Sequence, residues 1–206
     1  MKREQPNSNL VTRIDGARDL AKKIVRLFYL DSTDLAARFS VVSFNETATI
    51  RVTWSTDDGD IDAAIDAISP DGKTSISAGL TLAGQLLDNA RDNATKIVLL
   101  LTDGKQTVKS DGTVCSDEEQ TVCTDAAIAA AEALREKVFN DGTTVEDNVF
   151  AWGFGEEVGW VDPSGERVGG REALARLAGD DSRVQFTDNI SQLFDFLDKL
   201  LVDVCN

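Results

Sequence analysis

The sequence contains no histidine, only three cysteines and no long apolar run. Without histidine, Ser–His and Cys–His nucleophile pairs and imidazole metal sites are excluded. None of the cysteines has CxxC spacing, so neither a zinc site nor a thioredoxin-type motif is predicted. No run approaches the eighteen apolar residues that a membrane-spanning helix needs.

Basic residues are also scarce relative to acidic ones. The 206 residues include 21 Lys and Arg against 36 Asp and Glu, which gives a net charge of −15. This balance argues against binding to nucleic-acid phosphates, which requires a basic surface, and against an anionic membrane surface. It fits a protein that binds a hard cation or a basic partner.

The length predicts a single domain, residues 1–206. Along it, apolar residues follow helical spacing in some segments and form short strand-like runs in others. Helical spacing predicts helices over 10–30, 60–68, 77–90, 125–139 (with Thr124 as N-cap), 171–178 and 190–204. Short β-branched or apolar runs predict strands over 39–44, 48–52, 96–101, 148–153 and 184–186, and residues 156–170 could form a small hairpin. This alternation predicts an α/β fold with a mainly parallel sheet, helices on both faces, and 48–52 as an antiparallel edge strand.

Two loops predict a cation site. Asp103 and Gly104 directly follow the most apolar strand, and Thr74 lies in a loop just before a helix. Ligands bind beyond the carboxyl ends of strands in such folds, and hydroxyl and carboxylate oxygens suit Mg²⁺, Mn²⁺ or Ca²⁺. The alternatives are that Asp103-Gly104 forms only a turn and that Thr74 or Ser75 only caps the helix.

The order of these elements, with the segments RFSVVSF, DGKTSISAGL and KIVLLLTDG, resembles the von Willebrand factor type A domain from about Leu10 to Val204. The resemblance implies a three-layer, doubly wound, Rossmann-like fold that binds protein ligands through a metal-ion-dependent adhesion site. Thr74 and Asp103 match the second and third loops of that site. A Glu or Asp of the protein partner would complete the metal coordination.

The first loop of the family's metal site, D-x-S-x-S, does not occur before the first helix. We therefore expect that Met1 directly follows that motif in a longer protein, and that this domain lacks its first, central strand. The alternative is a natural domain that dispenses with this strand, although a parallel sheet without its centre exposes two unpaired edges. Strands 39–44 and 96–101 should then be separated by an empty slot, or else be collapsed together, and Mg²⁺ should bind weakly. Cys205 matches a cysteine that pairs with an upstream one in secreted family members, or it is a free thiol.

Cys115 and Cys123 lie eight positions apart in one polar loop. They are expected to form a local disulfide in an oxidising compartment, or to be reduced thiols in a cytosolic protein. Our interpretation is a non-enzymatic, extracellular protein-binding module. The alternatives are an intracellular assembly subunit with the same fold, and a phosphatase using Asp103 as nucleophile with Lys73 and Lys105 nearby.

Overall fold

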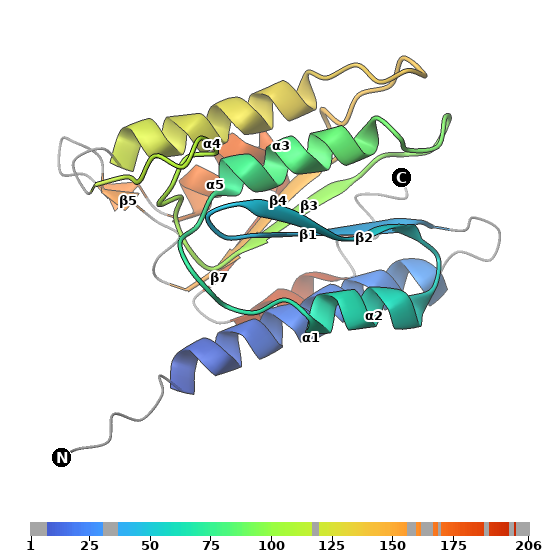
Figure 1. Ribbon diagram of the computed structural model, residues 1–206, viewed down its shortest axis with the longest axis horizontal. Coiled ribbons are helices and arrows are strands. Elements are labelled where there is room, and N and C mark those ends of the chain that lie inside the picture. The colour runs from blue at the N-terminus through green and yellow to red at the C-terminus, as the bar shows by residue number, and fades with distance from the viewer. Residues whose placement is uncertain are drawn as a thin grey trace.

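The computed structural model describes residues 8–30, 37–116, 120–155, 160–161, 167–168, 170–187, 190–197 and 200 (Figure 1). Its helices are α1 (Ser8–Leu30), α2 (Asp58–Asp66), α3 (Ile76–Leu87), α4 (Gln120–Arg135) and α5 (Gly170–Ala178), with the 3-10 helices η3 (Asp181–Arg183) and η4 (Ile190–Phe196). Its strands are β1 (Phe39–Phe44), β2 (Ala48–Ser55), β3 (Val98–Thr102), β4 (Val149–Phe154), β5 (Trp160–Val161), β6 (Arg167–Val168) and β7 (Val184–Thr187).

The strands form a parallel sheet and a separate antiparallel pair. Strands β3, β4 and β7 are parallel in the order β3-β4-β7, and all six residues of β4 are buried. A strand buried on both faces reads as a continuous apolar run, as VFAWGF does. Strands β1 and β2 pair antiparallel, and β5 pairs with β6 as the expected small hairpin. The fold is therefore α/β with parallel and antiparallel strands, as predicted.

Helices cover both faces of these strands. In Figure 1, α3 and α4 lie on one side and α1 and α2 on the other. The apolar cluster on the α3 side includes Leu80, Leu134 and Leu174. A second cluster, on the α1 side, includes Leu20 and Trp152. Every one of these side chains is at most 3% exposed. Trp152 is thus a packing residue.

The two sheets are separated where the sequence predicts a slot. Among the strands that the structure describes, β1 pairs only with β2, and β3 only with β4. All residues of β1 and β3 line one cavity of about 1150 Å³, with α1 on one side and α3 on the other. The expected separation of the two strands is confirmed.

Two local predictions were wrong or fall outside the described residues. Helix α4 begins at Gln120, so Thr124 is not its N-cap; it lies inside the helix, 6% exposed. Cys123, which forms a disulfide with Cys115, already lies within α4, so the helix starts before the predicted cap position. The expected closing helix over 190–204 begins as the 3-10 helix η4, and residues 201–206, with Cys205, lie outside the described residues.

Candidate functional site

The loop before α3 presents Thr74 beside a capped helix start. Gly72 has φ of 74°, a left-handed conformation that glycine adopts without a Cβ clash. The Oγ of Ser75, which is fully buried, accepts a hydrogen bond from the Ala78 N–H at 3.3 Å and caps α3. Because Ser75 takes the capping role, the Thr74 hydroxyl is not required for it.

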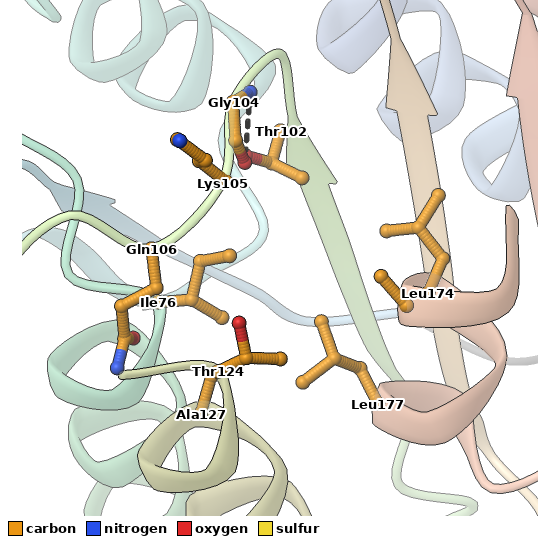
Figure 2. Close-up of a pocket in the computed structure, with 10 residues that line it drawn as sticks. Ile76, Thr102, Gly104, Lys105, Gln106, Thr124, Ala127, Leu174 and Leu177 are labelled. Atoms are coloured by element: carbon orange, nitrogen blue, oxygen red, sulfur yellow. Dashed lines mark hydrogen bonds between the residues drawn. The ribbon is translucent and has the colours of Figure 1, made fainter. Parts of the chain in front are cut away.

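The loop after β3 is a tight turn with Asp103 at its tip. The Oγ1 of Thr102, the last residue of β3, accepts a hydrogen bond from the Gly104 N–H at 3.3 Å and donates one to the Gly104 carbonyl at 3.0 Å (Figure 2). Both bonds bend the chain back on the strand end. Asp103 is half-buried between these two residues and has polar contacts of its own.

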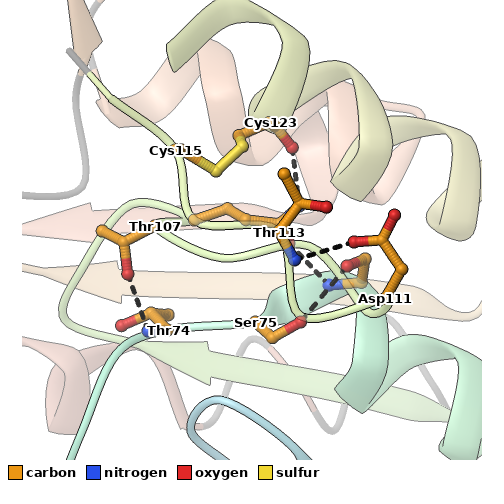
Figure 3. Close-up of a disulfide and its surroundings, with 9 residues drawn as sticks. Thr74, Ser75, Thr107, Asp111, Thr113, Cys115 and Cys123 are labelled. Atoms are coloured by element: carbon orange, nitrogen blue, oxygen red, sulfur yellow. Dashed lines mark hydrogen bonds between the residues drawn. A yellow bond between two sulfur atoms is a disulfide. The ribbon is translucent and has the colours of Figure 1, made fainter. Parts of the chain in front are cut away.

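These two loops meet at the carboxyl edge of the strands. The Thr74 Oγ1 lies 3.7 Å from the position that a Cβ on Gly104 would occupy. The Thr74 N–H donates to Thr107 Oγ1 at 2.8 Å, and the Thr74 carbonyl accepts from the Thr107 N–H at 2.8 Å (Figure 3). Two hydrogen bonds therefore fix Thr74 to the segment that follows Asp103.

Gln106 is a positioning residue that no sequence pattern predicts. Its side chain is 2% exposed; its Oε1 accepts from the Ser77 N–H at 2.7 Å, and its Nε2 donates to the Cys123 carbonyl at 2.6 Å. It thus joins the start of α3 to the disulfide segment. The only sequence signal was a glutamine close to the Thr102-Asp103-Gly104 turn, and such a residue ordinarily lies in solvent.

A disulfide between Cys115 and Cys123, with Cα atoms 6.1 Å apart, closes the loop beside these residues (Figure 3). The Cys115 N–H donates to the Thr107 carbonyl at 3.0 Å. Thr107 therefore links the disulfide to Thr74, because it also makes both hydrogen bonds to Thr74. Within the same loop, hydrogen bonds from Thr113, the backbone N–H first, lower the pKa of Asp111.

The donor set at this edge suits a hard cation. A hydroxyl and a carboxylate contribute oxygen ligands of the kind that Mg²⁺, Mn²⁺ and Ca²⁺ prefer. The glycine at position 104 leaves room beside the Thr74 hydroxyl, because a side chain there would approach it. The described residues contain no group of three or more His, Cys, Asp or Glu side chains able to hold a metal ion. Thr74 and Asp103 are the hydroxyl and the carboxylate in the two loops that meet at this edge.

No helix among the described residues is both long enough and apolar enough to span a membrane.

The sequence of this chain matches a known protein family. A family model described as the von Willebrand factor type A domain matches residues 2–106. No curated protein sequence matches the chain.

Several solved structures share the fold. Proximal thread matrix protein 1 from the mussel byssus, with a zinc-occupied MIDAS motif, is 23% identical with a TM-score of 0.64, over 97% of this chain and 42% of that one. A von Willebrand factor type A structure from Catenulispora acidiphila is 20% identical with a TM-score of 0.61, over 94% and 38%. The pilus adhesin SpaC from Lactobacillus rhamnosus GG is 13% identical with a TM-score of 0.67, over 94% and 28%.

This chain thus spans less than half the length of each of these three structures. At such low identity they establish the fold alone, whereas the family model covers just over half of the sequence. With the α/β fold and the two converging loops, the match identifies this chain as a member of the von Willebrand factor type A domain family.

Proposed function

We propose that this domain is a protein-binding module that holds a divalent cation through Thr74 and Asp103. The observation that carries the proposal is the approach of the Thr74 hydroxyl to the 102–104 turn, fixed by its hydrogen bonds to Thr107. The cation would supply positive charge at the carboxyl edge of the strands. A glutamate or aspartate of a protein partner then completes its coordination.

Electrostatics support a role for the cation in partner binding. With a net charge of −15, the protein repels an acidic side chain at long range. A bound divalent cation is the largest local charge in such a site and reverses the sign of the field there. Partner binding should therefore depend on the cation, because without it the partner's carboxylate meets the Asp103 carboxylate.

We propose a non-enzymatic role in which neighbouring residues position the two loops. Thr107 fixes the backbone of Thr74, and Gln106 fixes the start of α3.

We propose an extracellular location, since the Cys115–Cys123 disulfide is stable in an oxidising compartment. The similarity in fold to a pilus adhesin and a byssus matrix protein is consistent with a surface or secreted role.

The cation site is tested by Mn²⁺-induced line broadening in NMR spectra of the purified chain. Amides of residues 73–75 and 102–105 should broaden first, with affinity in about the millimolar range, because two protein ligands leave most of the coordination shell to water. Thr74→Val and Asp103→Asn should weaken this broadening. Asp71→Asn, an exposed carboxylate in the Thr74 loop, is the matched control and should change it little. Equal broadening in Asp103→Asn and the unmodified chain would refute the site.

Partner chemistry is tested by selecting peptides from a random library on the immobilised chain in Mg²⁺ and eluting them with EDTA. The eluted peptides should be enriched in Glu and Asp, and Asp103→Asn should not retain them. Recovery of the same peptides in the presence of EDTA would contradict cation-dependent binding.

A further inference from the structure

The disulfide closes a ring that includes the segment just after Asp103. The Cys115 N–H donates to the Thr107 carbonyl at 3.0 Å, and the Gln106 Nε2 donates to the Cys123 carbonyl at 2.6 Å. Because Gln106 and Thr107 are adjacent in the chain, the two hydrogen bonds, their peptide bond and the disulfide form a closed ring. The disulfide is the covalent link that holds Cys115 to α4.

The two cysteines differ in how firmly their surroundings hold them. Cys123 is fully buried within α4, which packs into the core through side chains such as Ala131 and Leu134, 0% and 3% exposed. Cys115 is half-buried, and residues 110–114, which precede it, are all exposed. Apolar packing therefore keeps Cys123 in place without the disulfide, whereas the position of Cys115 depends on it.

Thr107 connects the ring to the candidate cation site. The Thr74 N–H donates to the Thr107 Oγ1, and the Thr107 N–H donates to the Thr74 carbonyl, both at 2.8 Å (Figure 3). The Val108 N–H adds a third bond, to the same carbonyl at 3.2 Å. The orientation of Thr74 thus depends on where residues 107 and 108 lie. Loss of groups that orient metal ligands typically lowers metal affinity by about 10–100-fold.

Gln106 provides a second connection, which does not need the disulfide. Its Oε1 accepts from the Ser77 N–H at 2.7 Å, and its Nε2 bonds to the Cys123 carbonyl of α4. Gln106 is 2% exposed and Cys123 is fully buried, so both remain in the core when the S–S bond is broken. Reduction should therefore loosen the Thr107 side of the ring and leave the start of α3 in place.

We propose that the Cys115–Cys123 disulfide controls the cation affinity of this site. The oxidised chain binds the cation about tenfold more tightly than the reduced chain, because only the disulfide fixes the loop that orients Thr74. Val108, 2% exposed, keeps the loop attached in the reduced chain, so the affinity is lowered rather than lost. This inference rests on the proposed function, since it requires the cation site at Thr74 and Asp103.

A dithiol reductant acts on the disulfide in two steps. One thiolate of the reductant attacks the sulfur of Cys115, the more exposed of the two residues, and the S–S bond breaks. A mixed disulfide forms, and Cys123 leaves as a thiolate that takes up the proton released by the attacking thiol. The second thiol of the reductant then attacks the reductant sulfur of the mixed disulfide and gives its proton to Cys115. The protein gains two electrons and two protons, and the reductant leaves as a disulfide.

Hydrogen exchange without metal tests the local effect, in the oxidised chain and in the chain reduced with dithiothreitol. The amides of Thr74, Thr107 and Cys115 should exchange at least about fivefold faster in the reduced chain, because their hydrogen bonds open more often. The Ser77 amide and those of β4 should change little. Equal exchange of the first three amides in both forms would contradict the proposal. So would faster exchange along β4, because it would show that reduction unfolds the core.

Manganese affinity tests the control of the site. Mn²⁺-induced broadening at residues 73–75 and 102–105 is titrated in the oxidised chain and in the reduced chain, after the reductant is removed under nitrogen. The oxidised chain should bind about tenfold more tightly. Equal affinities in the two forms would overturn the redox control and leave the cation site standing. Absence of binding in both forms would overturn the cation site, and the control with it.

Variants separate the disulfide from the third cysteine. Cys115→Ser removes the disulfide without a reductant and should bind Mn²⁺ as weakly as the reduced chain, with no further change after treatment with dithiothreitol. Cys205→Ser is the matched control, because it removes a cysteine outside the disulfide. It should keep the full difference between the oxidised and reduced forms. The proposal fails if Cys115→Ser binds as tightly as the oxidised chain, or if Cys205→Ser abolishes the difference.

Discussion

The Gln106 bridge predicts a large effect from a small change in side chain. Replacing Gln106 with methionine keeps an unbranched chain of similar length but removes both the acceptor for the Ser77 N–H and the donor to the Cys123 carbonyl. Each backbone group left unsatisfied in the interior costs about 1–3 kcal/mol. The expected loss in the free energy of unfolding is therefore about 2–6 kcal/mol, a large share of the 5–15 kcal/mol typical of a domain.

Urea unfolding followed by tryptophan fluorescence measures this loss, with hydrogen exchange at the Ser77 amide as a local readout. Gln85→Met, on an exposed position of α3, is the matched control and should change stability by less than about 0.5 kcal/mol. In Gln106→Met the Ser77 amide should exchange faster relative to other amides of α3. If Gln106→Met and Gln85→Met unfold at the same urea concentration, the bridge does not hold α3 and the reasoning fails.

Three further predictions concern stability. The Lys96 ammonium, followed by hydroxyl and backbone donors, holds the pKa of Asp141 well below its ordinary value of 3.8, so this carboxylate stabilises the fold above about pH 4 and less as the pH falls further. The stability difference between the unmodified chain and Asp141→Asn should therefore narrow below pH 4 in acid-unfolding curves, and a constant difference would refute this role. Reducing the Cys115–Cys123 disulfide should lower stability by about 2.5 kcal/mol from loop-closure entropy, measured by urea unfolding with and without reductant, and no change would contradict it. Leu20→Ala, at a fully buried position of α1, should cost about 2–5 kcal/mol in the same assay, and a loss below 1 kcal/mol would show that the α1 core is loosely packed.

Local patterns in the sequence predicted most elements of the fold because their apolar periods match their burial. Residues 39–44 form β1 within the predicted bounds, and the apolar run ending at Leu101 forms β3. The predicted start of that strand at Lys96 was too early. Lys96 is 5% exposed and ion-paired to Asp141 at 2.6 Å. Because Asp141 is 45 residues away, no pattern in the sequence around Lys96 predicts this ion pair.

For the candidate site, the sequence predicted where its two loops lie but not the residues that orient them. The positions of Thr74 and Asp103 follow from topology, since loops at the carboxyl ends of parallel strands meet at one edge. The groups that orient them do not follow from it. Thr107 bonds Thr74 from 33 residues away, and Gln106 reaches both α3 and the disulfide segment. These contacts depend on the tertiary path of a polar loop, which has no apolar period to reveal it.

Separation of the two sheets has a consequence for how the molecule opens. Among the described residues no strand ladder joins β1 to β3, so the β1–β2 pair and the β3–β4–β7 sheet are connected through helix packing. Helix α1 contacts α2 and η4, and α3 contacts β1 and α4. Helix contacts that are apolar and non-directional permit sliding that a hydrogen-bonded ladder does not. The amides of β1, β2 and α2 should therefore exchange with solvent as one cooperative unit, at a lower free energy of opening than those of β3, β4 and β7.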